Sequence, residues 1–306
     1  MTDGAATAPA PEVAGIPTAN RAADVVRAAL ATSIRRLARA EPVARAGEDP
    51  EGVHRMRVAT RRLRSDLRTF GGALDPTWAE SLRRELRWLA RILGGAREAD
   101  VLRERIEGRV RVLPPTQAAA AEPLLSALER EARVAHDVLQ ATLGSARYVA
   151  LRARLEEAAV APRFGPNADE LPIPVLVPLV HRRWKKLRRE VRAAGAEPGG
   201  ATLHVIRIRA KRVRYAAEAL IPVGGDPVAR FAAAAKELQA VLGEHQDAVA
   251  AAGWITRWAD GHAAETATVD VARRLAQIER ETAREIRGRW RAVWIRLNDR
   301  SLRGWM

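Results

Sequence analysis

Apolar residues recur along most of the chain with the three-to-four-residue spacing of amphipathic helices. In the segment 53–70, for example, Val53, Met56, Leu63 and Leu67 fall on one stripe. Alternating runs of β-branched or aromatic residues between turns, which would indicate strands, do not occur in the sequence. The pattern therefore predicts helices at 21–40, 51–71, 77–93, 96–110, 116–143, 145–159, 173–194, 201–221, 226–242, 245–260 and 263–297.

Glycine and proline positions divide this helical pattern into two halves. Residues 1–20 are rich in Ala, Pro and Gly without periodicity, which is typical of a disordered tail, and they lack the basic and apolar regions of a secretory signal. The predicted organisation is a tail at 1–20, a first helical half at 21–159, a proline-rich linker at 160–174 and a second helical half at 175–306. Helix ends are expected at Gly71-Gly72, Gly94-Gly95, Gly195, Gly224-Gly225 and Gly243.

The two halves share a repeated motif. Residues 54–64 read H-x-x-R-x-x-x-R-R-x-R, and residues 204–214 read H-x-x-R-x-x-x-K-R-x-R, at an offset of 150. Ordered matches at a nearly constant offset indicate an internal duplication. The predicted fold is all-α, with two similar antiparallel helical bundles related by a pseudo-twofold axis. Two further segments also match between the halves. Residues 35–37 correspond to 185–187 at the same offset of 150, and residues 93–98 correspond to 242–247 at an offset of 149.

The positive charge is concentrated in three short segments. The chain has 306 residues, with 52 Lys and Arg against 37 Asp and Glu, a net charge of +15. The segments 53–64, 181–189 and 204–214 together hold 16 basic residues and no acidic one, so the remainder is close to neutral. A local positive field of this kind attracts polyanions. The absence of cysteine excludes disulfides, thiol catalysis and Cys-ligated zinc, and no apolar run is long enough to predict a membrane span.

Each copy of the motif places a cationic ladder beside the apolar stripe of its helix. The first ladder is His54, Arg57, Arg61, Arg64 and Arg68; the second is His204, Arg207, Lys211 and Arg214, and it ends in Glu218. Like charges three or four residues apart destabilise a helix by roughly 0.2–0.5 kcal/mol per pair, so five such pairs cost about 1–2.5 kcal/mol. Solvated faces are the simpler interpretation. The repetition at matched positions without interleaved acids instead favours an external anion, and arginine forks suit phosphate.

The two repeated histidines allow three interpretations. Each could be a locally hydrogen-bonded core or cap residue, a metal ligand or a phosphate contact. We favour the phosphate contact because His54 and His204 each begin a cationic ladder, and no HxxxH or HExxH spacing accompanies them. The sequence thus predicts no metal, no cofactor and no catalytic residue, since no general-base cluster stands beside the histidines. Nucleic-acid binding is the alternative function. Few aromatic residues are available to stack bases, and the basic helices lack the aromatic-rich apolar face expected at a membrane surface.

These segments resemble the CHAD family, the conserved-histidine α-helical domain. The resemblance rests on VHRMRVATRRLR, LHVIRIRAKRVRY, LGGAREADVL and LQAVLGEHQDAV and covers about residues 20–300. It implies two four-helix bundles around a basic cavity or pore that binds inorganic polyphosphate, in a cytoplasmic protein that could associate with polyphosphate granules. The resemblance implies ligand contacts from His54, Arg57, Arg61, Arg62, Arg64, His204, Arg207, Lys211, Arg212 and Arg214, with Arg35, Arg36, Lys185 and Lys186 as wall residues.

The chain departs from the family pattern after the repeated Leu-Gly turn. Family members often have an Arg-Asp pair there, whereas this chain has Arg97-Glu98 in the first copy and Gln246-Asp247 in the second. We expect the acidic residue to brace a ladder arginine. Some relatives add a triphosphatase domain marked by alternating glutamates and a lysine. This sequence has no ExExK motif, so the resemblance does not imply a polyphosphate hydrolase.

Overall fold

The described part of the computed structural model, residues 21–47, 49–170, 172–262 and 266–306, forms nine helices and no strand. The expected disordered tail at 1–20 lies outside these residues. None of the described helices is long and apolar enough to cross a membrane. The helices are α1 (Ala22–Ala46), α2 (Pro50–Thr69), α3 (Pro76–Val110), α4 (Pro115–Ala120), α5 (Glu122–Gly144), α6 (Ala146–Val160), α7 (Pro172–Ala193), α8 (Gly200–Gly261) and α9 (Thr266–Leu297).

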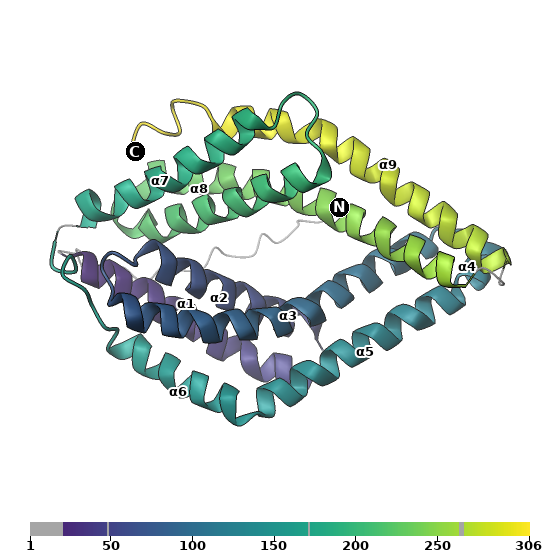
Figure 1. The fold of residues 1–306 in the computed structure, drawn as a ribbon, viewed down its shortest axis with the longest axis horizontal. Helices are drawn as coiled ribbons and strands as arrows, with labels where there is room; N and C mark the ends of the chain where they lie inside the picture. Colours follow the sequence, from purple (N-terminus) through teal and green to yellow (C-terminus); the bar gives the residue numbers. More distant parts are fainter. Residues whose placement is uncertain (1–20, 48, 171, 263–265) are drawn as a thin grey trace, which may run out of the picture.

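The helices form two elongated groups that meet at both ends of the molecule. Helices α1, α2, α3, α5 and α6 make one group, and α7, α8 and α9 make the other (Figure 1). One meeting point lies where α1 and α2 approach α7 and α8, and the second lies at the opposite tip, around α4 (Figure 1). The all-helical prediction is confirmed. The helices of the first group all precede residue 161, and those of the second group all follow residue 171.

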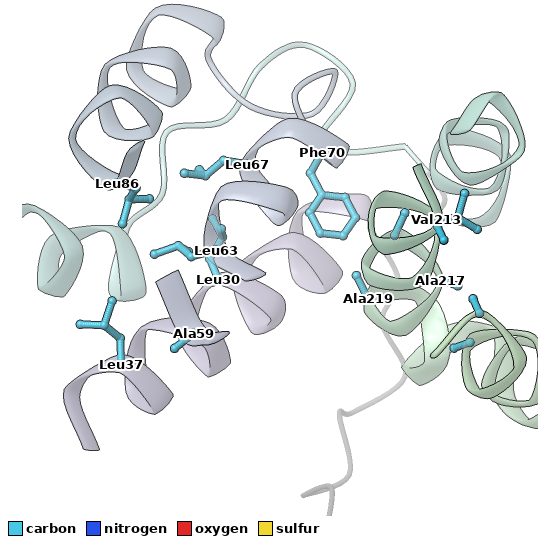
Figure 2. Packing of buried hydrophobic residues seen from close by; sticks show 14 of the residues in the cluster. Leu30, Leu37, Ala59, Leu63, Leu67, Phe70, Leu86, Val213, Ala217 and Ala219 are labelled. Atoms are coloured by element: carbon cyan, nitrogen blue, oxygen red, sulfur yellow. The ribbon is translucent and has the colours of Figure 1, made fainter. Parts of the chain in front are cut away.

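Two apolar clusters account for this arrangement. The larger one joins the buried stripes of α1, α2 and α3 to those of α7 and α8, and Figure 2 shows Phe70, just beyond α2, pointing toward Val213 and Ala219 of α8. The smaller cluster lies at the far tip, where Ile106 of α3 packs in the same cluster as Ile255 of α8. Burial of side chains of this size stabilises a fold by about 1.5–3 kcal/mol each, so both contacts hold the groups together.

Two of the expected helix ends are absent from the structure, and one break occurs where none was expected. Helix α3 continues through Gly94 and Gly95, and α8 continues through Gly243, because the flanking residues are helix formers with apolar positions in register on either side. Helix α8 breaks only at Gly225, whose φ of 59° and ψ of −151° are accessible to glycine. The expected single helix at 116–143 is in fact two helices that meet at Ala121.

The proline-rich segment between the halves is bound to the first half. The backbone N–H groups of Ala22 and Ala23 donate to the carbonyls of Glu170 and Ala168, both at 2.8 Å, and so satisfy free donors at the start of α1. An isolated antiparallel bridge joins Leu74 to Phe164. These contacts fix the path of the chain from α6 to α7.

A buried carboxylate also joins the two groups. Glu279 of α9 is fully buried and accepts hydrogen bonds from Nε of Arg105 at 2.6 Å and Nε of Arg109 at 2.8 Å, both on α3. The charges lie beside the smaller apolar cluster, which is where the two groups meet at the far tip. Removing one partner of a buried ion pair strongly destabilises a protein, because the remaining charge is left buried without compensation.

The variant Glu279→Ala should lower the free energy of unfolding by about 3 kcal/mol, because it leaves two arginines facing each other without a counter-charge. Glu285→Ala, an exposed position on the same helix, is the control and should change it by less than about 0.5 kcal/mol. Urea denaturation monitored by circular dichroism measures both. Equal effects of the two variants would contradict this role of Glu279.

Candidate anion-binding groove

The two ladder helices lie against each other because each buries its apolar stripe beneath its cations. Val53, Met56 and Leu63 of α2 and Ile206 of α8 are at most 1% exposed. Above them Arg61 donates from Nε to the Tyr215 hydroxyl at 3.1 Å, so the basic faces of α2 and α8 are adjacent. The apolar residues of the repeated motif thus position its charged residues.

Three hollows that share residues form one groove along these helices. The first, of about 480 Å³, lies between α2 and α3, and it shares Arg61 and Arg64 with the second, of about 260 Å³. The second shares Arg68 and Arg212 with the third, of about 580 Å³, which extends to α7. One carboxylate, from Glu98, lines the groove. Its cations are Arg57, Arg61, Arg64, Arg68, Arg91, Arg182, Arg183, Lys186, Arg209, Lys211 and Arg212.

Several like charges surround Lys211. Burial, followed by the charges of Arg61 and Arg207, lowers the pKa of this lysine to about 7. Burial and the charge of Arg212 lower the pKa of Arg68 to about 10. Burial is the largest cause of both shifts and the neighbouring cations add to it, so a bound anion would stabilise the charged forms of these two groups.

The acidic residues after the two Leu-Gly pairs face the ladders. A carboxylate oxygen of Glu98 lies 3.5 Å from a guanidinium nitrogen of Arg57. Asp247 is half-buried, burial raises its pKa, and the largest opposing influence is the charge of Arg207. The two acids therefore face matching arginines of the two motif copies, as the sequence led us to expect.

Glu218 separates two of the predicted ligand contacts from the groove. Its carboxylate accepts from a terminal nitrogen of Arg62 and from Nε of Arg214, both at 2.6 Å. None of the three lines the groove. At the repeat offset of 150, Glu218 corresponds to Arg68, so the same motif position carries a negative charge at the braced side and a positive charge in the groove.

The two motif histidines have different surroundings. His54 is half-buried, its Nδ1 has no partner among the described residues, and burial followed by the charge of Arg97 lowers its pKa. His204 is exposed, and its Nδ1 lies 3.1 Å from the side-chain oxygen of Gln246. His54 is thus neutral near pH 7 without a ligand, and it keeps one ring nitrogen free.

Only some of the predicted wall residues lie at the groove. Lys186 lines the third hollow, and Arg36 lies near Arg62, whose charge lowers its pKa after the effect of burial. Arg35 donates to the Thr32 hydroxyl at 3.2 Å instead. Neither Arg35 nor Lys185 lines the groove.

Five cations of the groove are not among the ligand contacts and wall residues predicted from the sequence. Arg182, Arg183 and Arg209 belong to the basic segments, and Arg68 is the last step of the first ladder, so a signal was present for these four. Arg91 lies in a stretch of mixed charge and reaches the groove only through the packing of α3 on α2.

The comparisons with known proteins agree with this architecture. A family model described as CHAD domain matches residues 28–256. Two Mycobacterium tuberculosis proteins, "Uncharacterized protein MT2285" and "Uncharacterized protein Rv2226", are each 35% identical over 208 residues, which is 65% of this chain and 39% of the relative. This chain therefore spans well under half the length of these relatives.

Two solved structures share the fold at 24% identity. PptA from Streptomyces chartreusis superposes with a TM-score of 0.75, covering 89% of this chain and 98% of that chain. The CHAD domain from the plant Ricinus communis gives a TM-score of 0.71, covering 92% and 94%. Since the family model spans more than half of the residues, this chain belongs to the CHAD family.

Proposed function

We propose that the groove binds inorganic polyphosphate and does not catalyse a reaction of it. The observation that carries this proposal is its lining of eleven cationic side chains and one carboxylate over three connected hollows. Membership of the CHAD family, which the sequence motifs led us to associate with polyphosphate, supports the choice of ligand. Association with polyphosphate granules in the cytoplasm would follow from the same affinity.

An extended phosphate polymer suits the groove better than a single small anion. All eleven positive charges come from four helices spread along connected hollows, and most are arginines, whose planar forks donate two hydrogen bonds to phosphate oxygens. Each phosphate of a chain would enter the field of several guanidinium groups. Binding would therefore relieve repulsion that the free protein carries.

We propose that the groove binds polyphosphate without hydrolysing it. Its one carboxylate, Glu98, faces Arg57, and no group of three or more His, Asp or Glu side chains in the described residues is arranged to hold a metal ion. A hydrolase of phosphoanhydrides needs an activated water or nucleophile. Release of orthophosphate from polyphosphate by the purified protein would contradict this part of the proposal.

Nucleic acid is the competing polyanion, and the aromatic residue of the groove does not favour it. Tyr215 is 3% exposed, and it lies between the guanidinium groups of Arg61 and Arg214, which are 5.9 Å and 5.1 Å from its ring centroid. Single-stranded nucleic acid usually binds through bases stacked on exposed aromatic rings. Tyr215 offers no such surface.

The double variant Arg64→Gln/Arg68→Gln should weaken polyphosphate binding at least about 30-fold, since two charged hydrogen-bond donors contribute roughly 1 kcal/mol or more each. Neither side chain makes a hydrogen bond or ion pair among the described residues, so the same change should leave the fold equally or more stable. Isothermal titration calorimetry and thermal denaturation measure the two effects.

Arg130→Gln/Arg273→Gln is the matched control, because it removes the same net charge from exposed positions outside the groove. Its affinity should stay within about twofold of the unaltered protein at moderate salt, where distant surface charges are screened. An equal loss in both double variants would mean that net charge, and not the groove, drives binding.

Polyphosphate affinity should fall as the pH rises above 7, because Lys211 has a pKa of about 7 in the free protein and a bound phosphate would raise it. Formation of the complex then takes up a proton, and the affinity for polyphosphate falls by at most about tenfold for each pH unit. Lys211→Arg stays charged and should flatten the slope between pH 7 and 9. His54, with its lowered pKa, titrates below this range. Calorimetry in buffers of different ionisation enthalpy measures the proton uptake; the same slope in both proteins would contradict the assignment.

A further inference from the structure

A separate hollow of about 490 Å³ lies between the second part of α8 and α9. It shares no lining residue with the groove. Its floor holds the buried Ala252 of α8 and Ala283 of α9, the exposed Val249 of α8 also lines it, and no carboxylate does. This combination of an apolar floor and a polar wall is typical of sites for small organic molecules.

The wall of the hollow carries three arginines of α9. Arg280, Arg284 and Arg287 follow one another at successive helical turns, and none of them forms an ion pair with another described residue. Arg280 is oriented by Thr256, whose hydroxyl oxygen accepts its hydrogen bond at 2.7 Å. Elsewhere on the same helix, Glu279 and Arg296 do find partners of opposite charge. The three arginines therefore present uncompensated positive charge to one hollow.

A buried histidine lines the same hollow. His245 is 5% exposed, and within the described residues its ring makes no hydrogen bond. Burial and the charge of Arg287 lower its pKa, so the ring is neutral near pH 7. A ligand in the hollow would offer the ring nitrogens of His245 a hydrogen-bond partner.

The start of α8 completes the polar wall. Gly200 is the first residue of this helix and lines the hollow, and no side chain caps the helix there. The first N–H groups of a helix lack partners within it, and they carry the positive end of the helix dipole. A Cβ at Gly200 would meet no atom within 4 Å, so the space in front of this turn is open. Phosphate groups bind at such helix starts.

We propose that this hollow binds a small phosphate monoester. Its phosphoryl group would lie between His245, Arg287 and the start of α8, with Arg284 and Arg280 beside the rest of the molecule. The uncharged body would rest on the floor formed by Ala252 and Ala283. The volume accommodates a ligand of sugar-phosphate or mononucleotide size. This site is independent of the polyphosphate groove.

Nuclear magnetic resonance of the ¹⁵N-labelled histidine rings tests the proposal, with His245 assigned by the variant His245→Gln. The probes are inorganic phosphate, glucose 6-phosphate and adenosine monophosphate. A bound phosphoryl group should raise the pKa of His245 and shift its ring signals, and at least one ester should bind tenfold more tightly than inorganic phosphate. No shift of the His245 signals with any probe up to 10 mM, or equal binding of inorganic phosphate and both esters, would overturn the proposal.

Arg287→Gln should weaken binding of the ester at least tenfold, whereas Arg289→Gln, an exposed neighbour outside the hollow, should change it less than twofold. Circular dichroism confirms that both variants fold. Polyphosphate affinity should not respond to Arg287→Gln, and ester binding should not respond to Arg64→Gln/Arg68→Gln. A loss of both activities in either variant would show one continuous site and overturn the proposal of a separate one.

Discussion

Repulsion between the cations of α2 and α8 is the constraint on which the rest of the structure depends. Arg57, Arg61, Arg207 and Lys211 lie within one another's electrostatic field, and burial together with the neighbouring arginines lowers the pKa of the lysine to about 7. Such an arrangement persists only because the opposite edges of both helices are buried in one apolar cluster. The buried Glu279 and the apolar contact at the far tip keep the two groups of helices joined beyond the charged region.

One motif position decides where the repulsion is relieved within the chain. Glu218 neutralises Arg62 and Arg214, whereas Arg68, at the corresponding position of the other copy, adds a charge to the groove. The two similar ladders therefore give two different sides: a braced side, where Glu218 pairs with Arg62 and Arg214, and an open side, which is the groove that Arg68 lines. Our account of function rests on this difference, because only the open side needs an external anion.

Helix content and the ladders could be predicted from the sequence, because both follow from spacing within single helices. The glycine stops at Gly94 and Gly243 could not, since a glycine ends a helix only when the neighbouring turns lack packing that continues it. The pairing of Arg62 with Glu218 was equally inaccessible, because 156 residues separate the two partners. The internal duplication stays a prediction from the repeated motif.

The most direct test of the account is the affinity for long-chain polyphosphate at about 150 mM salt in the presence of excess single-stranded and duplex nucleic acid, where screening removes much of the general attraction between unlike charges. If the open side is a dedicated phosphate-polymer site, binding remains tight and the competitors displace little. Equal displacement by nucleic acid would contradict the account and identify the groove as a general polyanion surface.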